Sequence, residues 1–296
     1  MKANGGNAGG APKSPGPWKA AWIRLQRQRT AMWALGFLAL VVALCVGGPW
    51  LSPYTESQQN LDHVKEMPGW SHWMGTDQLG RDVATRILFG GRVSLLVGVV
   101  ATAVAMVIGV VYGLISGFFG GRLDSAMMRL IDILYGFPFM AFIILISAVF
   151  GRNFILLFVA IGAVEWLTTA RVVRAQVLGL KHQEFILASR VCGAGSGHIL
   201  LRHLLPNVMG QVVIYASLTV PGVMLLEGVL SFLGLGVQPP SSSWGVLIQE
   251  GASNMETAPW LLFFPGVFFV MTLLALNTLG DGLRDALDPK TNREGS

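Results

Sequence analysis

Long stretches without charge are the feature of this sequence that most restricts its fold. No charged residue lies between Arg92 and Arg122, and a helix needs about 20 consecutive apolar residues to cross a bilayer. Hydrophobic side chains make up 53% of the 296 residues and charged ones 12%, against about 25% charged in a typical soluble domain. Because so little polar surface cannot cover a water-soluble globule of this length, the sequence predicts an integral membrane protein.

Six apolar stretches predict six transmembrane helices, and thus an all-α membrane fold. The first, at residues 31–51, is longer than the apolar part of a secretory signal and has no small-residue cleavage site behind it, so we expect it to be retained. The stretches that contain the six helices are 31–51, 94–118, Asp132–Arg152, Arg152–Arg171, Val208–Gly236 and Glu256–Asp281.

Lys and Arg are shared unevenly between the segments that join these helices. Sixteen of the 21 lie in the amino-terminal tail, residues 119–132, residues 171–206 and the carboxy-terminal tail. Because cytoplasmic segments carry the excess of positive charge, we expect both termini in the cytoplasm. The net charge of +5 does not indicate a nucleic-acid partner, because the basic residues form no surface interleaved with aromatic side chains.

The chain therefore divides into a tail, a lead-in and a helical core. Residues 1–17 are rich in Gly and Pro and have no apolar face, which predicts a disordered tail. The segments predicted after it are a cytoplasmic amphipathic lead-in at 18–30, the first transmembrane helix at 31–51, an external segment at 52–92, a core with five transmembrane helices at 93–290 and a tail at 291–296.

The second predicted helix carries one smooth face. Small residues let two helix backbones approach closely within a membrane. We expect this face to pack against another helix of the chain or, alternatively, against a second subunit. The small residues, which recur every four positions, are Ala101, Ala105, Gly109, Gly113 and Gly117.

The cytoplasmic connection at 171–207 is far longer than a turn requires. The spacing of its apolar residues predicts a helix around Glu184–Val191, with Phe185, Ala188 and Cys192 along one side. After a glycine-rich break, Ser196 is expected to cap a second helix that ends at Pro206. Such a segment either lies on the membrane surface or docks on a soluble partner.

Several motifs carry a resemblance to a known family. The sequence is similar to permease subunits of ABC importers, whose cytoplasmic "EAA" loop couples them to ATPases, and most similar to the C-type subunit of the oligopeptide/dipeptide branch over about residues 20–290. The motifs are Glu184-x-x-x-Ala188-Ser189-x-x-x-Gly193, Arg202-His203-x-Leu205-Pro206-Asn207, Gly75-Thr76-Asp77-x-x-Gly80-Arg81-Asp82, Glu227-Gly228-x-Leu230-Ser231-Phe232-Leu233-Gly234-Leu235-Gly236, Pro239-Pro240 with Ser243-Trp244-Gly245, and Gly280-Asp281-Gly282-Leu283-Arg284-Asp285-Ala286-Leu287-Asp288-Pro289.

The resemblance implies a multi-pass protein of the bacterial inner membrane that works within a complex. Its implied partners are a sister permease, two ATP-binding subunits and a periplasmic or lipid-anchored substrate-binding protein. The sequence has no phosphate-binding G-x-x-x-x-G-K-[ST] motif, so we expect no catalytic residue and no cofactor in this chain. ATP and Mg are expected in the partner subunits, and lipid surrounds the helices.

The resemblance also assigns the loop at 184–206 to ATPase coupling. Glu184 is expected to pair with a basic residue of the ATPase or to cap its own helix, whereas Arg202 and His203 are as suited to lipid headgroups as to protein. Gly195 and Gly197 depart from the family pattern and favour a broken or more mobile segment. The coupling residues implied are Glu184, Ala188, Ser189, Gly193, Arg202, His203 and Pro206.

Two acids fall inside predicted helices, where a carboxylate normally faces a cavity or a partner. Glu165 lies close to Arg171 and Arg174, so ion pairing is the simpler interpretation and the substrate pathway or a subunit contact the other. Glu227 lies deeper, after Pro221, and we expect it either to contact the sister permease or to line the substrate pathway.

The external segments have simpler interpretations. Thr76 or Asp77 is expected to cap a helix at 80–89 that touches the membrane through Val83, Ile87 and Leu88, with contact to the binding protein as the alternative. Trp244 is expected to anchor an interfacial loop. The five histidines have no metal-ligand spacing, so we predict no metal site.

Two other functional classes compete with an importer subunit. A secondary transporter is disfavoured because no internal repeat is evident, and an intramembrane enzyme because the spans offer only Glu165 and Glu227. Peptides are the default cargo of the branch that the sequence resembles. Nickel chelates, haem and glutathione are the alternatives.

Overall fold

The computed structural model describes residues 16–150 and 154–287. These residues form an elongated bundle of helices, and the only β pairing among them is an isolated bridge between Thr76 and Asp82. The predicted disordered tail and the carboxy-terminal tail at 291–296 lie almost entirely outside the described residues, as does Arg152.

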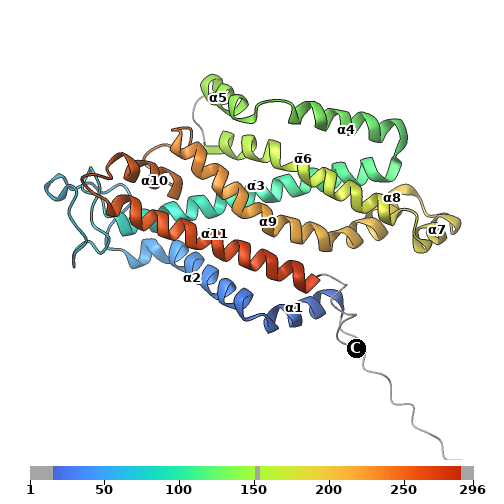
Figure 1. Cartoon of the computed structure of the whole chain (residues 1–296), viewed down its shortest axis with the longest axis horizontal. Helices are drawn as coiled ribbons and strands as arrows, with labels where there is room; N and C mark the ends of the chain where they lie inside the picture. The colour runs from blue at the N-terminus through green and yellow to red at the C-terminus, as the bar shows by residue number, and fades with distance from the viewer. Residues whose placement is uncertain (1–15, 151–153, 288–296) are drawn as a thin grey trace, which may run out of the picture.

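In Figure 1 the described chain runs from the lower edge of the bundle, where it begins, through the centre to the upper edge and back. A short 3-10 helix, η1 (Leu61–His63), lies in the long connection after α2, and a π-helix, η2 (Ile199–Leu204), precedes α9. The α-helices are α1 (Pro17–Arg27), α2 (Arg29–Leu51), α3 (Val83–Phe119), α4 (Gly121–Tyr135), α5 (Phe139–Phe150), α6 (Phe154–Leu180), α7 (Glu184–Val191), α8 (Ser196–His198), α9 (Leu205–Phe232), α10 (Trp244–Ser253) and α11 (Trp260–Leu287).

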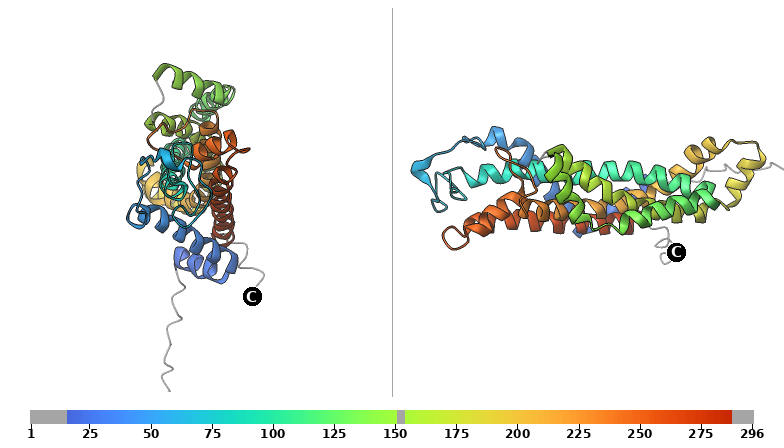
Figure 2. Two further views of the ribbon diagram at one scale, coloured as in Figure 1. Left: turned by 90° about the vertical axis from the view of Figure 1, so that its left-hand side faces the viewer. Right: turned by 90° about the horizontal axis from the view of Figure 1, so that it is seen from above.

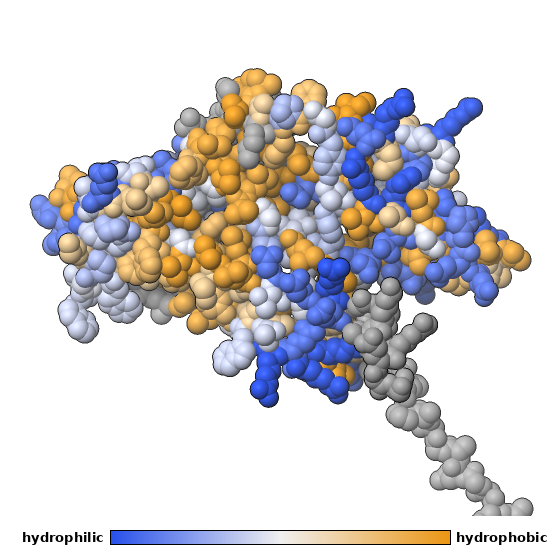
Figure 3. All heavy atoms as spheres, in the orientation of Figure 1, coloured by the Kyte–Doolittle hydropathy of each residue, from blue (hydrophilic) through white to orange (hydrophobic). Residues whose placement is uncertain are grey.

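The bundle has two distinct ends (Figures 1 and 2). We call the end formed by α7, α8 and η2 the α7 end, and the end formed by α10 and residues 52–82 the α10 end. Hydrophobic residues form a broad band between the two ends on the face shown in Figure 3, and hydrophilic residues gather toward the ends. This distribution suits a protein whose middle lies in lipid.

Four helical runs of the described residues are long and apolar enough to cross a membrane. They coincide with four of the six predicted stretches. The four runs are Arg29–Gly48, Val83–Phe119, Ser196–Phe232 and Trp260–Leu287.

The smooth face of α3 packs against α6 of the same chain. Ala101 and Ala105 are fully buried. A Cβ atom on Gly113 would lie 2.6 Å from the carbonyl oxygen of Ala170, and one on Gly109 would lie 2.5 Å from Cβ of Thr169. Backbones this close leave no room for a second subunit between the two helices.

The structure corrects the predicted organisation of residues 119–150. The expected loop at 119–132 is helical from Gly121 onward, as α4. The third apolar stretch is divided between α4 and the 12-residue α5. The break between them coincides with Pro138, which lacks a backbone donor and restricts the residue before it.

A second correction concerns Pro206, which does not end a helix. Helical structure runs without interruption from Ser196 to Phe232, and Pro206 lies in the first turn of α9. The run accommodates this residue because η2 precedes it, and the wider π-helical turn shifts the carbonyl that the proline ring would otherwise meet.

At the edge of the bundle that lies opposite α4 and α5, α1 packs across the last turns of α11. Leu25, Ala31 and Ala286 form a small buried cluster there. The guanidinium of Arg24 donates to the carbonyl oxygen of Ala286 at 3.2 Å. The beginning and the end of the described chain are thus joined on the side of the α7 end (Figure 1).

Candidate functional site

The helix α7 presents most of its surface outward. Ile186 is its one buried side chain, and it belongs to a core cluster with Val177 and Leu204. By contrast, Val191 is 88% exposed, and Phe185 is also exposed. Because apolar side chains normally pack inward, this face has the character of a contact surface.

The predicted coupling residues share this exposed surface with two exceptions, His203 and Ser189. His203 is half-buried and faces Ser189, whose Oγ lies 3.2 Å from its Nε2. Ser189 is itself half-buried. The exposed members of the predicted set are Glu184, Ala188, Gly193, Arg202 and Pro206.

Gly193 ends α7 in a conformation that suits glycine. Its φ is +81°, in the left-handed region, which other residues adopt at a cost. The amides of Gly193 and Ala194 donate to the carbonyls of Arg190 and Ser189 at 2.9 and 3.1 Å. This hydrogen-bonded ending explains why the chain reverses sharply between α7 and α8.

The α7 end is tied to the bundle by charged groups on α6 and directly after it. Lys181 donates through Nζ to the carbonyl oxygen of Gly117 at 3.0 Å. Arg174 makes a two-pronged contact with Asp124, with Nε–Oδ1 and Nη2–Oδ2 distances of 2.5 and 2.6 Å. The same carboxylate also accepts a hydrogen bond from the Ser116 hydroxyl.

The pairing predicted for Glu165 is wrong. Arg174 pairs with Asp124, and Arg171 pairs with Asp132, with 2.6 Å between Nη2 and Oδ1. Glu165 is partly exposed. Among the described residues, no ion pair joins the carboxylate of Glu165 to Arg171 or Arg174.

Glu227 is fully enclosed within the chain and accepts hydrogen bonds from three serine hydroxyls. Ser231 and Ser243 each donate to Oε1 at 2.6 Å, and Ser94 donates to Oε2 at 3.2 Å. Its side chain is 0% exposed. In this conformation Glu227 links α3, α9 and the residue that caps α10, and its side chain is not exposed on the surface of the described chain.

Trp244 and the start of α3 also lie deeper than predicted. Trp244 is 0% exposed, and its Nε1 donates to the carbonyl oxygen of Ile87 at 2.9 Å. Val83 and Ile87 are buried in the same cluster, so they do not face lipid. The residue that caps α3 is Asp82, which accepts from the amide of Thr85 at 2.8 Å.

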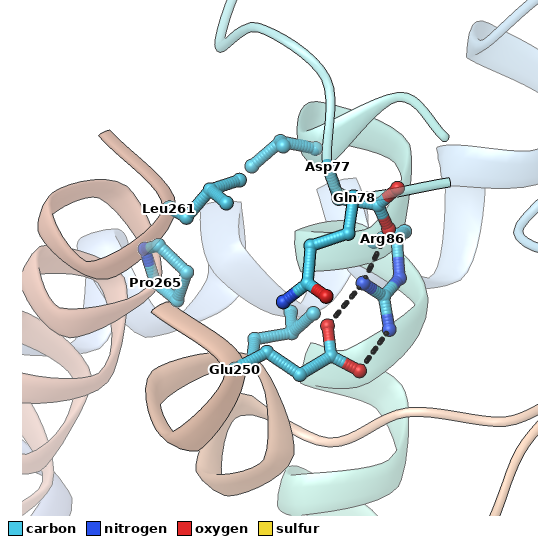
Figure 4. Close-up of a pocket in the computed structure, with 8 residues that line it drawn as sticks. Asp77, Gln78, Arg86, Glu250, Leu261 and Pro265 are labelled. Atoms are coloured by element: carbon cyan, nitrogen blue, oxygen red, sulfur yellow. Dashed lines mark hydrogen bonds and ion pairs between the residues drawn. The ribbon is translucent and has the colours of Figure 1, made fainter. Parts of the chain in front are cut away.

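A buried ionic network at the α10 end was not foreseen from the sequence. Arg86 lies between two acids, with Nη1 2.7 Å from Oδ2 of Asp77 and 2.5 Å from Oε2 of Glu250 (Figure 4). Arg81 donates from Nε to Asp77 at 2.7 Å. The four-residue spacing of Asp77 and Arg81 was visible in the sequence, whereas the approach of Glu250 required the fold.

The histidines at the α10 end each face a single carboxylate. Nδ1 of His63 lies 2.5 Å from Glu66, and Nδ1 of His72 lies 2.9 Å from Asp82. Within residues 16–150 and 154–287, no three His, Cys, Asp or Glu side chains gather as metal ligands would.

Comparison with known proteins gives consistent matches. Residues 109–293 match the family described as binding-protein-dependent transport system inner membrane component, and residues 16–68 match the N-terminal TM domain of oligopeptide transport permease C. The chain is 52% identical over 275 residues to the oligopeptide transport system permease protein OppC of Escherichia coli K12, covering 92% of this chain and 91% of that one.

Two further relatives are named for the transport of different substrates. The dipeptide transport system permease protein DppC of Bacillus subtilis strain 168 is 45% identical over 274 residues, which cover 92% of this chain and 86% of the relative. The glutathione transport system permease protein GsiD of Escherichia coli O6:K15:H31 is 39% identical over 275 residues, covering 93% and 91%.

Proposed function

Because the chain belongs to the binding-protein-dependent transport system inner membrane component family, we propose that it is the permease subunit of an ATP-driven ABC importer for di- or oligopeptides. The observation that carries this function is the 52% identity to an oligopeptide permease over 92% of the chain. The protein is an integral inner membrane protein and, like its relatives, a permease component. Hydrolysis of ATP with its Mg belongs to the partner subunits.

The proposed topology has six transmembrane helices and both termini in the cytoplasm. The four long apolar runs supply four of them, and the helical residues of α4 with α5 and of α6 supply the third and fourth. The α7 end then faces the cytoplasm and residues 52–92 face outward. This orientation follows the excess of Lys and Arg at the α7 end.

The proposed complex contains a sister permease, two ATP-binding subunits and a periplasmic or lipid-anchored binding protein. The exposed face of α7 fits the ATPase contact, because its apolar side chains have no cover within the described chain. Glu184, Ala188 and Gly193 would lie at this contact, with Arg202 near it. His203 would not take part in the contact itself, and its hydrogen bond to Ser189 would hold α7 in place.

The complex is tested by purifying the tagged full chain from native membranes in mild detergent. We expect mass spectrometry to find a second permease and one or two ATPases with it. Recovery of the chain alone would overturn the importer function and favour a self-sufficient transporter.

The orientation has its own test. Cys192 is exposed at the α7 end and Cys45 is buried, while Glu256 is exposed at the α10 end. A membrane-impermeant maleimide added to intact spheroplasts should label the Glu256→Cys variant and leave the wild-type chain unlabelled. Labelling of the wild-type chain before permeabilisation would reverse the topology.

Glutathione is the second candidate cargo, because one relative of 39% identity is named for it. Uptake of labelled trialanine and of labelled glutathione can be compared in cells with and without this gene. Loss of trialanine uptake alone supports the peptide importer, and loss of glutathione uptake alone would replace it.

A further inference from the structure

Three tryptophan side chains at the α10 end are exposed to a degree that is unusual for rings of this size. Trp50, in the last turn of α2, is 86% exposed. Trp70 and Trp73, in the connection between α2 and α3, are 98% and 77% exposed. A single exposed apolar side chain needs no explanation, whereas a group of them marks a contact surface.

The connection that carries Trp70 and Trp73 is held against the residues that follow α2. The hydroxyl of Tyr54 donates to the carbonyl oxygen of Ser71 at 3.1 Å, and the rings of Tyr54 and His72 have centroids 4.8 Å apart. Ser71 and His72 are the residues between the two tryptophans. Both tryptophans are therefore fixed close to the point where α2 ends.

The end of α2 marks the boundary between membrane and water. Its 23 residues extend about 35 Å at 1.5 Å per residue, slightly more than the hydrocarbon core of about 30 Å. A spanning α2 thus brings its last turn, and the connection held beside it, to the level of the lipid headgroups. Tryptophan is enriched at this level in membrane proteins, because its ring is apolar and its N–H is polar.

A cavity of about 490 Å³ lies between this connection and the two helices. Trp70 and Trp73 line it, together with Leu44 of α2 and Leu88 of α3. Leu44 belongs to the part of α2 that is long and apolar enough to cross a membrane, and nearby Val46 is 54% exposed. The cavity therefore continues the lipid-facing surface of α2 toward the headgroup level.

The charges and hydroxyls of the cavity favour a lipid over a charged protein surface. Asp82 is the only charged residue among the described ones that line it, and its carboxylate is already engaged by Nδ1 of His72 at 2.9 Å and Oγ1 of Thr85 at 2.7 Å. The remaining polar lining includes Ser52 and Ser71. An apolar cavity with a few polar groups at its edge matches an acyl chain joined to a polar headgroup.

We propose that this cavity binds an acyl chain of a phospholipid from the leaflet at the α10 end, with Trp70 and Trp73 at headgroup level. The bound lipid would anchor the connection between α2 and α3 to the membrane surface. This inference goes beyond the proposed transport function. It depends neither on the cargo nor on which side of the membrane the α10 end faces.

The test uses the full chain in phosphatidylcholine vesicles that contain a trace of phosphatidylcholine with a diazirine in its acyl chain. After illumination and digestion with trypsin, mass spectrometry measures the fraction of the peptide at 66–81 that carries lipid. Cleavage after Lys65 and Arg81 releases this peptide, which contains both tryptophans. We expect labelling of the wild-type peptide. Trp70→Ala with Trp73→Ala should lower the labelled fraction about tenfold, because the cavity loses two large apolar walls.

Two matched variants separate the rings from the peptide that carries them. Trp70→Phe with Trp73→Phe should keep at least half of the wild-type labelling, because both aromatic rings remain. Met67→Ala should label as wild type. Met67 lies on the same peptide and is 75% exposed, but it does not line the cavity.

A wild-type peptide at 66–81 without lipid would overturn the inference. The same holds if the phenylalanine variant labels as poorly as the alanine variant, or if Met67→Ala lowers labelling as much as the alanine variant does. Docking of the binding protein is the competing use of this surface. In the complete complex, the binding-protein concentration that half-maximally stimulates the ATPase should be equal for wild type and the alanine variant, and a several-fold rise would assign the surface to the binding protein instead.

Discussion

Arg86 and Glu250 lie 164 positions apart in the chain, and their side chains meet in a two-pronged ion pair. Nη1 is 2.5 Å from Oε2 and Nη2 is 3.1 Å from Oε1. Asp77 approaches Nη1 of the same guanidinium at 2.7 Å. One arginine therefore joins the connection before α3 to α10, and it does so with a side chain that is only 4% exposed.

Replacing Arg86 should destabilise the protein strongly. In Arg86→Met, Asp77 would lose one of its two arginine partners in a buried site and keep Arg81, and removing one partner of a buried ion pair costs about 3–5 kcal/mol. The free energy of unfolding can be measured by titrating detergent-solubilised protein with SDS. Arg129→Met is the control, because Arg129 is exposed on α4 and should change stability by less than about 0.5 kcal/mol. Equal stability of the two variants would contradict the network's role.

Two glycine substitutions should have opposite effects on stability. In Gly113→Ala the new Cβ would lie 2.6 Å from the carbonyl oxygen of Ala170, so α3 and α6 must separate, at a cost of about 1–3 kcal/mol. In Gly179→Ala the new Cβ meets nothing within 4 Å, and the helix gains about 1 kcal/mol from the better helix former. The same SDS titration checks both, and a loss of stability in Gly179→Ala would show that α6 has a neighbour there.

Replacing Ser243, which caps α10 and contacts a buried carboxylate, should lower the free energy of unfolding more than replacing a serine of α10 that has no such contact. Ser243 donates to Glu227 at 2.6 Å and also caps α10 by accepting from the amide of Val246. We expect Ser243→Ala to cost about 1–3 kcal/mol, because a buried carboxylate loses a donor.

The control for Ser243 is Ser253→Ala. Ser253 is exposed and donates only to the carbonyl of Gln249, so the cost should stay below about 0.5 kcal/mol. Similar unfolding free energies for the two variants would mean that Glu227 finds another donor.

The left-handed backbone conformation of Gly193 allows a test of its proposed role in coupling to the ATPase. Alanine at a φ of +81° is strained by about 1–2 kcal/mol, which should disturb the end of α7. We expect Gly193→Ala to reduce peptide moved per ATP in the reconstituted complex. Gly195 has a φ of −69° and no neighbour within 4 Å of a new Cβ, so Gly195→Ala should retain the wild-type ratio. A fully coupled Gly193→Ala complex would argue against a role of this turn in coupling.

Features of the fold that depend on local sequence could be predicted. The absence of charge between Arg92 and Arg122 is a property of neighbouring residues, and α3 covers most of that range. The helix at Glu184–Val191 was predicted at its observed bounds from apolar spacing. In both cases the signal lies within the element itself.

Features that depend on distant partners could not be predicted. Trp244 resembles an interfacial anchor by composition, and only the arrival of Ile87 and Phe269 makes it a core residue. Glu227 is enclosed because serines from α3, from α9 and from the cap of α10 converge on it. The effect of Pro206 depends on the π-helical turn before it, and no local pattern of residues indicates that turn.

The uninterrupted helix from Ser196 to Phe232 makes the two ends of the molecule mechanically dependent. Its 37 residues extend about 55 Å at 1.5 Å per residue, from the surface beside α7 to the serines around Glu227. A rod of this length cannot shift at one end without moving the other, unless it bends. The two prolines within it, Pro206 and Pro221, are the points where bending costs least. A displacement of this helix beside α7 would thus either tilt the whole helix, and so move its other end, or bend it at a proline.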